Sequence, residues 1–122
     1  MDRKIVCEEL KKKGIRVISF DFTEDGYHLE VKATDKCQGM EVIENISIRG
    51  FDVIRVNITG IHAKVRLVPN NDKEYENFIK DFVESYGLPE EYAISELKRI
   101  VNKCSNVDNH ASIESFLRRR CK

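Results

Sequence analysis

The sequence predicts an α+β fold: an antiparallel four-stranded sheet built from two helix–hairpin units, followed by two or three C-terminal helices. Two observations predict it. A helix-like segment followed by two strand-like segments occurs twice in residues 1–68, and the apolar spacing of residues 69–122 is helical. The 122 residues, of which 41% are hydrophobic, suit one core. We therefore expect a single domain, residues 1–122, with a duplicated core over 1–68 and a helical part over 69–122.

The two units of the core are similar in sequence. Residues 6–23 (VCEELKKKGIRVISFDFT) align with residues 42–59 (VIENISIRGFDVIRVNIT), and after a gap of two residues 26–32 align with 60–66. Nine of the 25 aligned positions are identical. We interpret this similarity as an internal duplication. Two hairpins that arose independently would have much the same local structure.

The first unit predicts a helix and a hairpin. Val6 and Leu10 form an apolar stripe over residues 3–13, and Gly14 is a typical helix stop. Residues 24–26 (Glu-Asp-Gly) predict a turn between two strands. On both strands apolar residues alternate with polar ones, as a half-buried strand requires. The inward set is Ile18, Phe20 and Phe22 before the turn, and Tyr27, Leu29, Val31 and Ala33 after it.

The second unit begins with residues 40–48, which fit either a helix or a strand. The ambiguity arises because β-branched residues are frequent there, namely Val42, Ile43, Ile46 and Ile48. The hairpin is clearer, since Thr59-Gly60 predicts a tight two-residue turn. The inward residues are Ile54, Val56 and Ile58 before this turn, and Ile61, Ala63, Val65 and Leu67 after it.

Three helices are expected after Pro69. Asn71 caps the first, which Gly87 ends, and Pro89 suits the first turn of the second. Asp108 or Asn109 is expected to cap the last helix. The apolar residues at helical spacing are Tyr75, Phe78, Ile79, Phe82, Leu97, Ile100, Val101, Cys104, Ile113, Phe116 and Leu117. We expect Phe116 and Leu117, which have few neighbours in sequence, to be free to dock on a partner.

Tandem helix–hairpin units can share one sheet, with both helices on one face and the second strand of each hairpin at the centre. Residues 27–33 and 61–67 would then be neighbours. This connectivity resembles a circularly permuted ferredoxin-like fold. Ferredoxin-like RNA-binding proteins bind their ligand on the two central strands. The resemblance implies that function lies on the polar side of this sheet.

The polar side gathers basic residues and two histidines: His28, Lys32, Arg55, His62, Lys64 and Arg66. A turn at Thr59-Gly60 would place Asn57 opposite His62 and Arg55 opposite Lys64. Such a face can attract phosphates, but it offers no aromatic side chain for base stacking. His28 and His62 meet there and are a candidate metal pair, although no third ligand is evident. We expect no cofactor.

Charge is also segregated along the helical part. Residues 69–95 hold two Lys and Arg residues against seven Asp and Glu, whereas residues 96–122 hold seven against three. The densest basic cluster is Arg118-Arg119-Arg120, close to the end of the chain. It can contact phosphate or an acidic surface, or it can complement the dipole of the last helix.

These features favour a small non-enzymatic binding protein that contacts nucleic acid or a nucleoprotein complex. The residues predicted to bind are Lys32, Arg55, Lys64, Arg66, Arg118, Arg119 and Arg120. The zero net charge of the chain argues against this function, because nucleic-acid-binding domains are usually basic. The alternative is a protein–protein adaptor or inhibitor, or a chain that forms a homodimer.

A second alternative is an enzyme. The stretch FDFTEDGYHLEVKAT (residues 20–34) resembles the core motif of PD-(D/E)xK nucleases. The resemblance implies that Asp21 and Glu30 hold a divalent metal while Lys32 assists the attacking water. A turn at residues 24–27 would place Asp21 opposite Glu30, and Glu8 or Glu9 would supply the carboxylate of the helix.

The sequence indicates an intracellular, cytoplasmic protein without a membrane partner. Its longest stretch without Asp, Glu, Lys or Arg is eight residues, 56–63, and its first ten residues form no apolar leader. Four cysteines without a CxxC spacing are expected to be free thiols. Cys7 and Cys104 are predicted to lie in the core and Cys121 to be exposed, while Cys37 is left unassigned.

Overall fold

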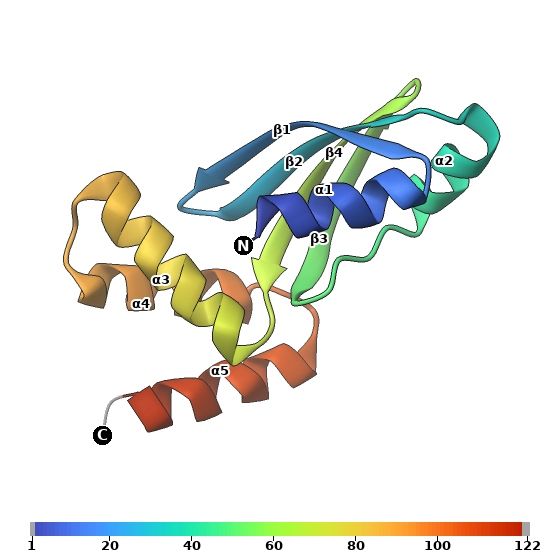
Figure 1. Cartoon of the computed structure of the whole chain (residues 1–122). Coiled ribbons are helices and arrows are strands. Elements are labelled where there is room, and N and C mark those ends of the chain that lie inside the picture. Colours follow the sequence, from blue (N-terminus) through green and yellow to red (C-terminus); the bar gives the residue numbers. More distant parts are fainter. Residues whose placement is uncertain (1, 121–122) are drawn as a thin grey trace.

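The computed structural model describes residues 2–120, with all their side chains except those of residues 36–38. It confirms the α+β class: four antiparallel strands form one sheet, and five helices accompany it (Figure 1). In chain order the elements are α1 (Arg3–Lys12), β1 (Ile15–Thr23), β2 (Gly26–Ala33), α2 (Lys36–Glu44), β3 (Phe51–Thr59), β4 (His62–Pro69), α3 (Asp72–Tyr86), α4 (Glu90–Asn102) and α5 (Val107–Arg120).

The strand order is β1-β2-β4-β3, so the second strand of each hairpin is central, as predicted. All three neighbouring pairs are antiparallel. This order is the one expected for a permuted ferredoxin-like connectivity, which stays an interpretation of the topology. Gly26 begins β2 with φ of 117° and allows the close approach to β4, because a Cβ there would lie 2.5 Å from the Leu67 carbonyl oxygen.

Both edge strands contain a β-bulge at the equivalent place. The register shifts between Val17 and Ser19 in β1, and between Val53 and Arg55 in β3. The extra residues are Ile18 and Ile54, which we expected to face the core but which are 47% and 39% exposed. The inward positions before the bulges belong instead to Val17 and Val53, because a bulge inserts one unpaired residue. The two units thus share order, pairing and irregularity.

One face of the sheet is apolar and lies against helices. α1 packs on β1 and α2 on β2, while α3 inserts Phe78 beside Phe22 and Tyr27, with ring centroids 5.2 and 6.3 Å apart. The Tyr27 hydroxyl donates to Asp81 Oδ2 at 2.6 Å and thereby ties the sheet to α3. Apolar residues from both the duplicated core and the helical part form one buried cluster.

Residues 36–44 form a helix, which settles the ambiguity of the second unit. The helix begins earlier than the predicted segment 40–48, and Ile46 and Ile48 are buried in the irregular segment that follows it. Gly39 allows α2 to pack closely, since a Cβ there would lie 2.8 Å from the Ala33 side chain. The β-branched residues thus divide between the helix and the segment that leads into β3.

The helical part follows the predicted spacing, with two corrections. Asn71 and Gly87 cap α3 as expected. α5 is capped by Asn106, whose Oδ1 accepts the Asp108 amide at 3.1 Å, and not by Asp108 or Asn109. The expectation that Phe116 is free to dock on a partner is wrong, because its ring packs 5.1 Å from that of Tyr75 on α3 and it is buried.

The cysteine predictions are half confirmed. Cys104 is buried as a free thiol, but Cys7 is exposed. Cys7 follows Val6 by one residue, and a step of one residue along a helix turns a side chain away from the Val6–Leu10 stripe that faces the core. The Cys37 side chain and Cys121 lie outside the described residues.

Candidate nucleic-acid interface

The second face of the sheet is polar and, in residues 2–120, no helix covers it (Figure 1). The registers of the three strand pairs arrange its side chains in three rows across the sheet, each row running through β1, β2, β4 and β3. In that order they are the Asp21 row (Asp21, His28, Arg66, Arg55), the Glu30 row (Ser19, Glu30, Lys64, Asn57) and the Lys32 row (Arg16, Lys32, His62, Thr59).

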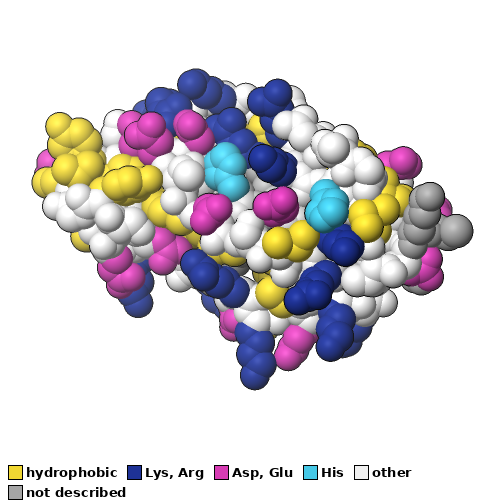
Figure 2. Space-filling view, turned by 90° about the horizontal axis from the view of Figure 1, so that it is seen from above, with side chains coloured by type: hydrophobic (Ala, Val, Ile, Leu, Met, Phe, Trp, Pro, Cys, Tyr) yellow, Lys and Arg dark blue, Asp and Glu magenta, His cyan; other side chains and the backbone are white. Residues whose placement is uncertain are grey.

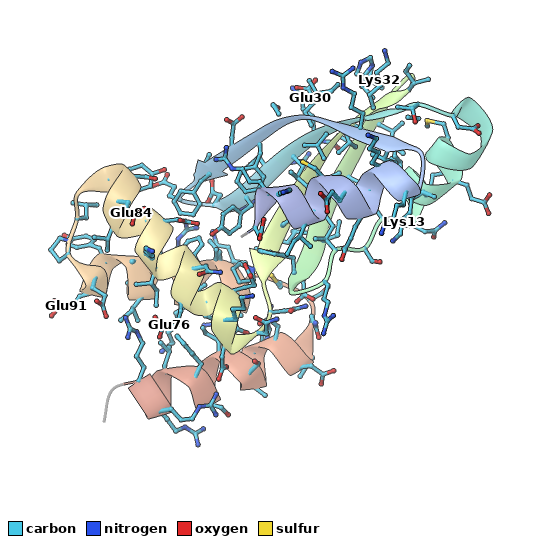
Figure 3. All side chains as sticks on the ribbon, viewed as in Figure 1. Lys13, Glu30, Lys32, Glu76, Glu84 and Glu91 are labelled. Carbon is cyan, nitrogen blue, oxygen red and sulfur yellow. The ribbon has the colours of Figure 1, made fainter. Side chains whose placement is uncertain are left out.

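The open face has more positive than negative groups. The three rows contain five Lys and Arg side chains against two carboxylates, although the whole chain has no net charge. Figure 2 shows Lys and Arg gathered on this face around a few Asp, Glu and His side chains. Glu30 and Lys32 point away from the helices (Figure 3). The face is therefore where the positive charge of this neutral chain collects.

The face is hollowed rather than flat. A shallow depression of about 420 Å³ lies across all four strands. Its polar lining comes from the Asp21 and Glu30 rows and from the end of β1: Ser19, Asp21, Thr23, His28, Glu30, Arg55, Asn57, Lys64 and Arg66. Among the described residues, Arg55 and Lys64 make no ion pair. Two cations thus line the depression without an ion pair to any described residue.

The predicted turn of the second hairpin is displaced by one residue, so each predicted partner is displaced by two. Thr59 pairs with His62, so the turn is Gly60-Ile61 and not Thr59-Gly60. Arg55 therefore lies opposite Arg66, and Asn57 lies opposite Lys64. Like charges directly opposite each other destabilise a sheet. A bound anion would reduce the repulsion between the Arg55 and Arg66 guanidinium groups.

The predicted nuclease geometry is not formed. Thr23 pairs with Gly26, which places Asp21 opposite His28 and Glu30 opposite Ser19. Asp21 and Glu30 share the face but lie diagonally, in neighbouring rows. Glu8 and Glu9 belong to α1, which packs on the other face of the sheet. Among the described residues no three His, Cys, Asp or Glu side chains could hold a metal ion.

The two histidines do not meet either. His28 lies opposite Arg66 and His62 opposite Lys32, so they belong to rows separated by the Glu30 row. His28 Nε2 lies 3.0 Å from Thr23 Oγ1, which fixes the ring over the depression. Burial and, next, the Arg66 guanidinium lower the pKa of His28 below its usual 6.5. Its ring is thereby kept neutral at physiological pH.

Arg66 is held by the turn of the first hairpin. Its Nε donates to the Asp25 carbonyl oxygen at 3.1 Å, and its guanidinium lies 3.5 Å from the Asp25 carboxylate. Arg99 from α4 donates to the same carboxylate at 3.1 Å and to Glu96 at 2.8 Å. Hydrogen bonding from Arg99 holds the pKa of Asp25 below its ordinary value. Arg66 is the positioned cation of the face, whereas Arg55 and Lys64 are unpaired.

The tail arginines lie elsewhere and are paired. Arg119 bonds Asp72 at the start of α3, and Arg120 bonds Glu90 on α4 and lies 3.5 Å from Glu76 on α3 (Glu76 in Figure 3). Arg118 is 3.7 Å from Glu114 on its own helix. The opposite charges of residues 69–95 and 96–122 thus meet within the molecule, and the structure does not bring the tail to the sheet face.

Sequence reasoning missed three residues of this site. Arg16 joins the Lys32 row because the bulge at Ile18 shifts the alternation, which otherwise places Arg16 on the apolar face. Ser19 and Thr23 line the depression, but no neighbouring motif in the sequence marks these two residues as functional. A two-residue turn at Glu24-Asp25 pairs Thr23 with Gly26 and Asp21 with His28. This register sets Thr23 and His28 diagonally on one face, so the turn was the signal from which their contact could have been predicted.

No protein-family model, curated protein or solved structure matches this chain. None of the helices in residues 2–120 is long and apolar enough to cross a membrane. The function must therefore be argued from the geometry of the open face.

Proposed function

We propose that this protein binds single-stranded nucleic acid on the open face of the sheet, through the sugar–phosphate backbone rather than through the bases. One observation carries the proposal: five Lys and Arg side chains from four strands converge on one hollowed face of a chain without net charge. A charged groove that follows the backbone is what sequence-independent single-strand binding requires.

The spacing and composition of the face support a polymeric anion. Neighbouring rows lie about 6.8 Å apart, because each step spans two residues of roughly 3.4 Å. Cations therefore recur along the strands from Arg55 to Lys64 to Lys32 rather than forming one point charge. No Phe, Tyr or Trp side chain belongs to the three rows, so the affinity depends mainly on phosphate contacts.

The test is the salt dependence of binding to fluorescent oligouridine and oligothymidine, measured in EDTA by anisotropy. The variant Lys32→Ala/Arg55→Ala/Lys64→Ala removes three cations from the face. Each phosphate contact to a single strand contributes about 0.7 to the slope of log K against log salt. We expect the slope to fall by about 2 and the affinity at 0.1 M salt to fall roughly 100-fold.

The matched control is Lys11→Ala/Lys12→Ala/Lys13→Ala, which removes the same charge from exposed positions at the end of α1 (Lys13 in Figure 3). It should bind like the unmodified protein. If the control lowers the affinity as much as the face variant does, binding follows net charge and not this face. If the unmodified protein does not bind at low salt, the proposal is wrong.

A further inference from the structure

The Asp21 row places a neutral imidazole next to two guanidinium groups. His28 is followed across the sheet by Arg66 on β4 and then by Arg55 on β3. Neighbouring strands are about 4.8 Å apart. A strand that binds with a phosphate between the two arginines and its 5′ side toward β2 therefore places the adjoining ribose within reach of the His28 ring.

His28 is oriented for such a role. Its Nε2 is engaged by Thr23 Oγ1 at 3.0 Å, while its Nδ1 has no hydrogen bond to any described residue. Both His28 and the two arginines line the same depression. Asp21 lies opposite His28 on the other side, where its carboxylate stabilises the imidazolium that forms when the ring accepts a proton.

We propose that the Asp21 row cleaves RNA without a metal ion, with His28 as the general base that activates the ribose 2′-hydroxyl. This inference rests on the proposed function, since it needs a bound strand. His28 takes the 2′-hydroxyl proton, the 2′-oxygen attacks the adjacent phosphorus, and the phosphorus–O5′ bond breaks. The leaving 5′-oxygen takes a proton from water, and the resulting hydroxide removes the proton from His28.

The products are a 2′,3′-cyclic phosphate end and a free 5′-hydroxyl. Arg55 and Arg66 stabilise the negative charge that accumulates on the phosphoryl oxygens in the transition state. Lys64, one row away, lines the same depression and adds to this positive field. The lowered pKa of His28 agrees with the role, because a general base must be unprotonated when the strand binds. DNA lacks the 2′-hydroxyl and is bound but not cut.

The experiment incubates the full chain with oligouridine in EDTA and analyses the ends of the products by mass spectrometry. A second oligonucleotide carries 2′-deoxyuridine throughout. We expect cleavage of the RNA alone, with cyclic phosphate ends. His28→Ala and His28→Gln should lower the rate at least about 100-fold, the lower range for loss of a general base. The Lys11→Ala/Lys12→Ala/Lys13→Ala variant, purified in the same way, should cut at the original rate.

Two results would overturn the inference: no cleavage by the unmodified protein, or cleavage that persists in both His28 variants, which would identify a contaminating ribonuclease. Binding to the deoxy oligonucleotide is scored separately. If the protein binds this strand but does not cut RNA, the inference fails and the proposed function stands. If it neither binds nor cuts, both fail.

Discussion

The molecule has two basic regions, and their surroundings differ. On the sheet face, Arg55 and Lys64 lie over a depression without an ion pair to any described residue. On α5, Arg118, Arg119 and Arg120 each contact a carboxylate. In the sequence the tail is the more conspicuous cluster, because its arginines are consecutive, whereas the cations of the face come from four strands. The density of basic residues along the sequence therefore did not indicate which of them are free of carboxylate partners in the described structure.

The difference has a physical cause. The acidic residues of α3 and α4 fold back against the basic end of α5, so the charges segregated along the chain neutralise each other in space. On the sheet face Arg66 has the Asp25 carboxylate as a partner, whereas Arg55 and Lys64 make no ion pair with a described residue. A phosphate meets unpaired cations on the sheet but must displace a carboxylate at the tail.

The largest effect expected at the tail concerns stability. Arg118→Ala/Arg119→Ala/Arg120→Ala removes three arginines whose partly exposed ion pairs are worth about 0.2–1 kcal/mol each. The free energy of unfolding should fall by roughly 1–2 kcal/mol, and the melting temperature, measured by calorimetry at low salt, by roughly 3–8 °C.

Affinity for oligouridine should change less than about twofold in this variant, in contrast to the roughly 100-fold loss expected for the sheet-face variant. The sequence-based prediction that Arg118, Arg119 and Arg120 bind nucleic acid is tested by the same measurement. A loss of affinity without a change in melting temperature would reverse the comparison between the two regions.

A smaller effect separates the arginines of the tail from one another. The Arg120 side chain is 22% exposed and reaches carboxylates on α3 and α4, whereas Arg118 is 77% exposed and reaches only its own helix. Arg120→Ala should cost about 1 kcal/mol and Arg118→Ala about 0.3 kcal/mol in unfolding by urea. Equal costs would mean that the contacts between helices add nothing to stability.

Much of the fold followed from the sequence because alternation and helical spacing report which side of an element is buried. Tyr27, Leu29 and Val31 alternate without interruption, and β2 was predicted correctly. Ile18 and Ile54 were misplaced because a bulge depends on the partner strand, which a single strand's pattern does not reveal. Cys7 was misplaced because a small apolar residue next to a buried stripe can face either way.

The site was predicted in composition but not in geometry. Lys32, Lys64 and Arg66 lie on the polar face as expected, since each follows the alternation of a central strand. The predicted partner of Lys64, Arg55, was wrong because moving a two-residue turn by one position changes every pair in the hairpin. The contacts of Arg120 with Glu76 and Glu90 could not be predicted from the sequence, because they depend on how α5 packs on α3 and α4.

The smallest expected effect is a pH dependence in which protonation of His28 raises the affinity for nucleic acid but lowers the rate of cleavage. The charged groups that face His28 are Arg66, Asp25 and Asp21, and with burial their balance lowers its pKa. The folded chain therefore binds this proton less readily than the unfolded chain, so stability falls as the pH drops below about 6.5 toward the folded value. When the pH falls below the lowered pKa of His28 in the folded protein, the protonated ring adds one cation to the face. The affinity for oligothymidine should then rise up to about fivefold at 0.1 M salt.

Cleavage of oligouridine should decline over the same range, because a protonated His28 cannot accept the 2′-hydroxyl proton. As the pH falls from 7.5 to 5.5, the affinity measured by anisotropy should therefore rise, while the cleavage rate measured by product analysis should fall. In His28→Gln the contribution of this residue to the pH dependence of binding should vanish. If affinity and rate rise together on acidification, His28 is not the base; if neither changes, it does not face the bound strand. The sheet face would then reduce to its lysines and arginines, of which Arg55 and Lys64 differ from the tail arginines in making no ion pair with a described residue.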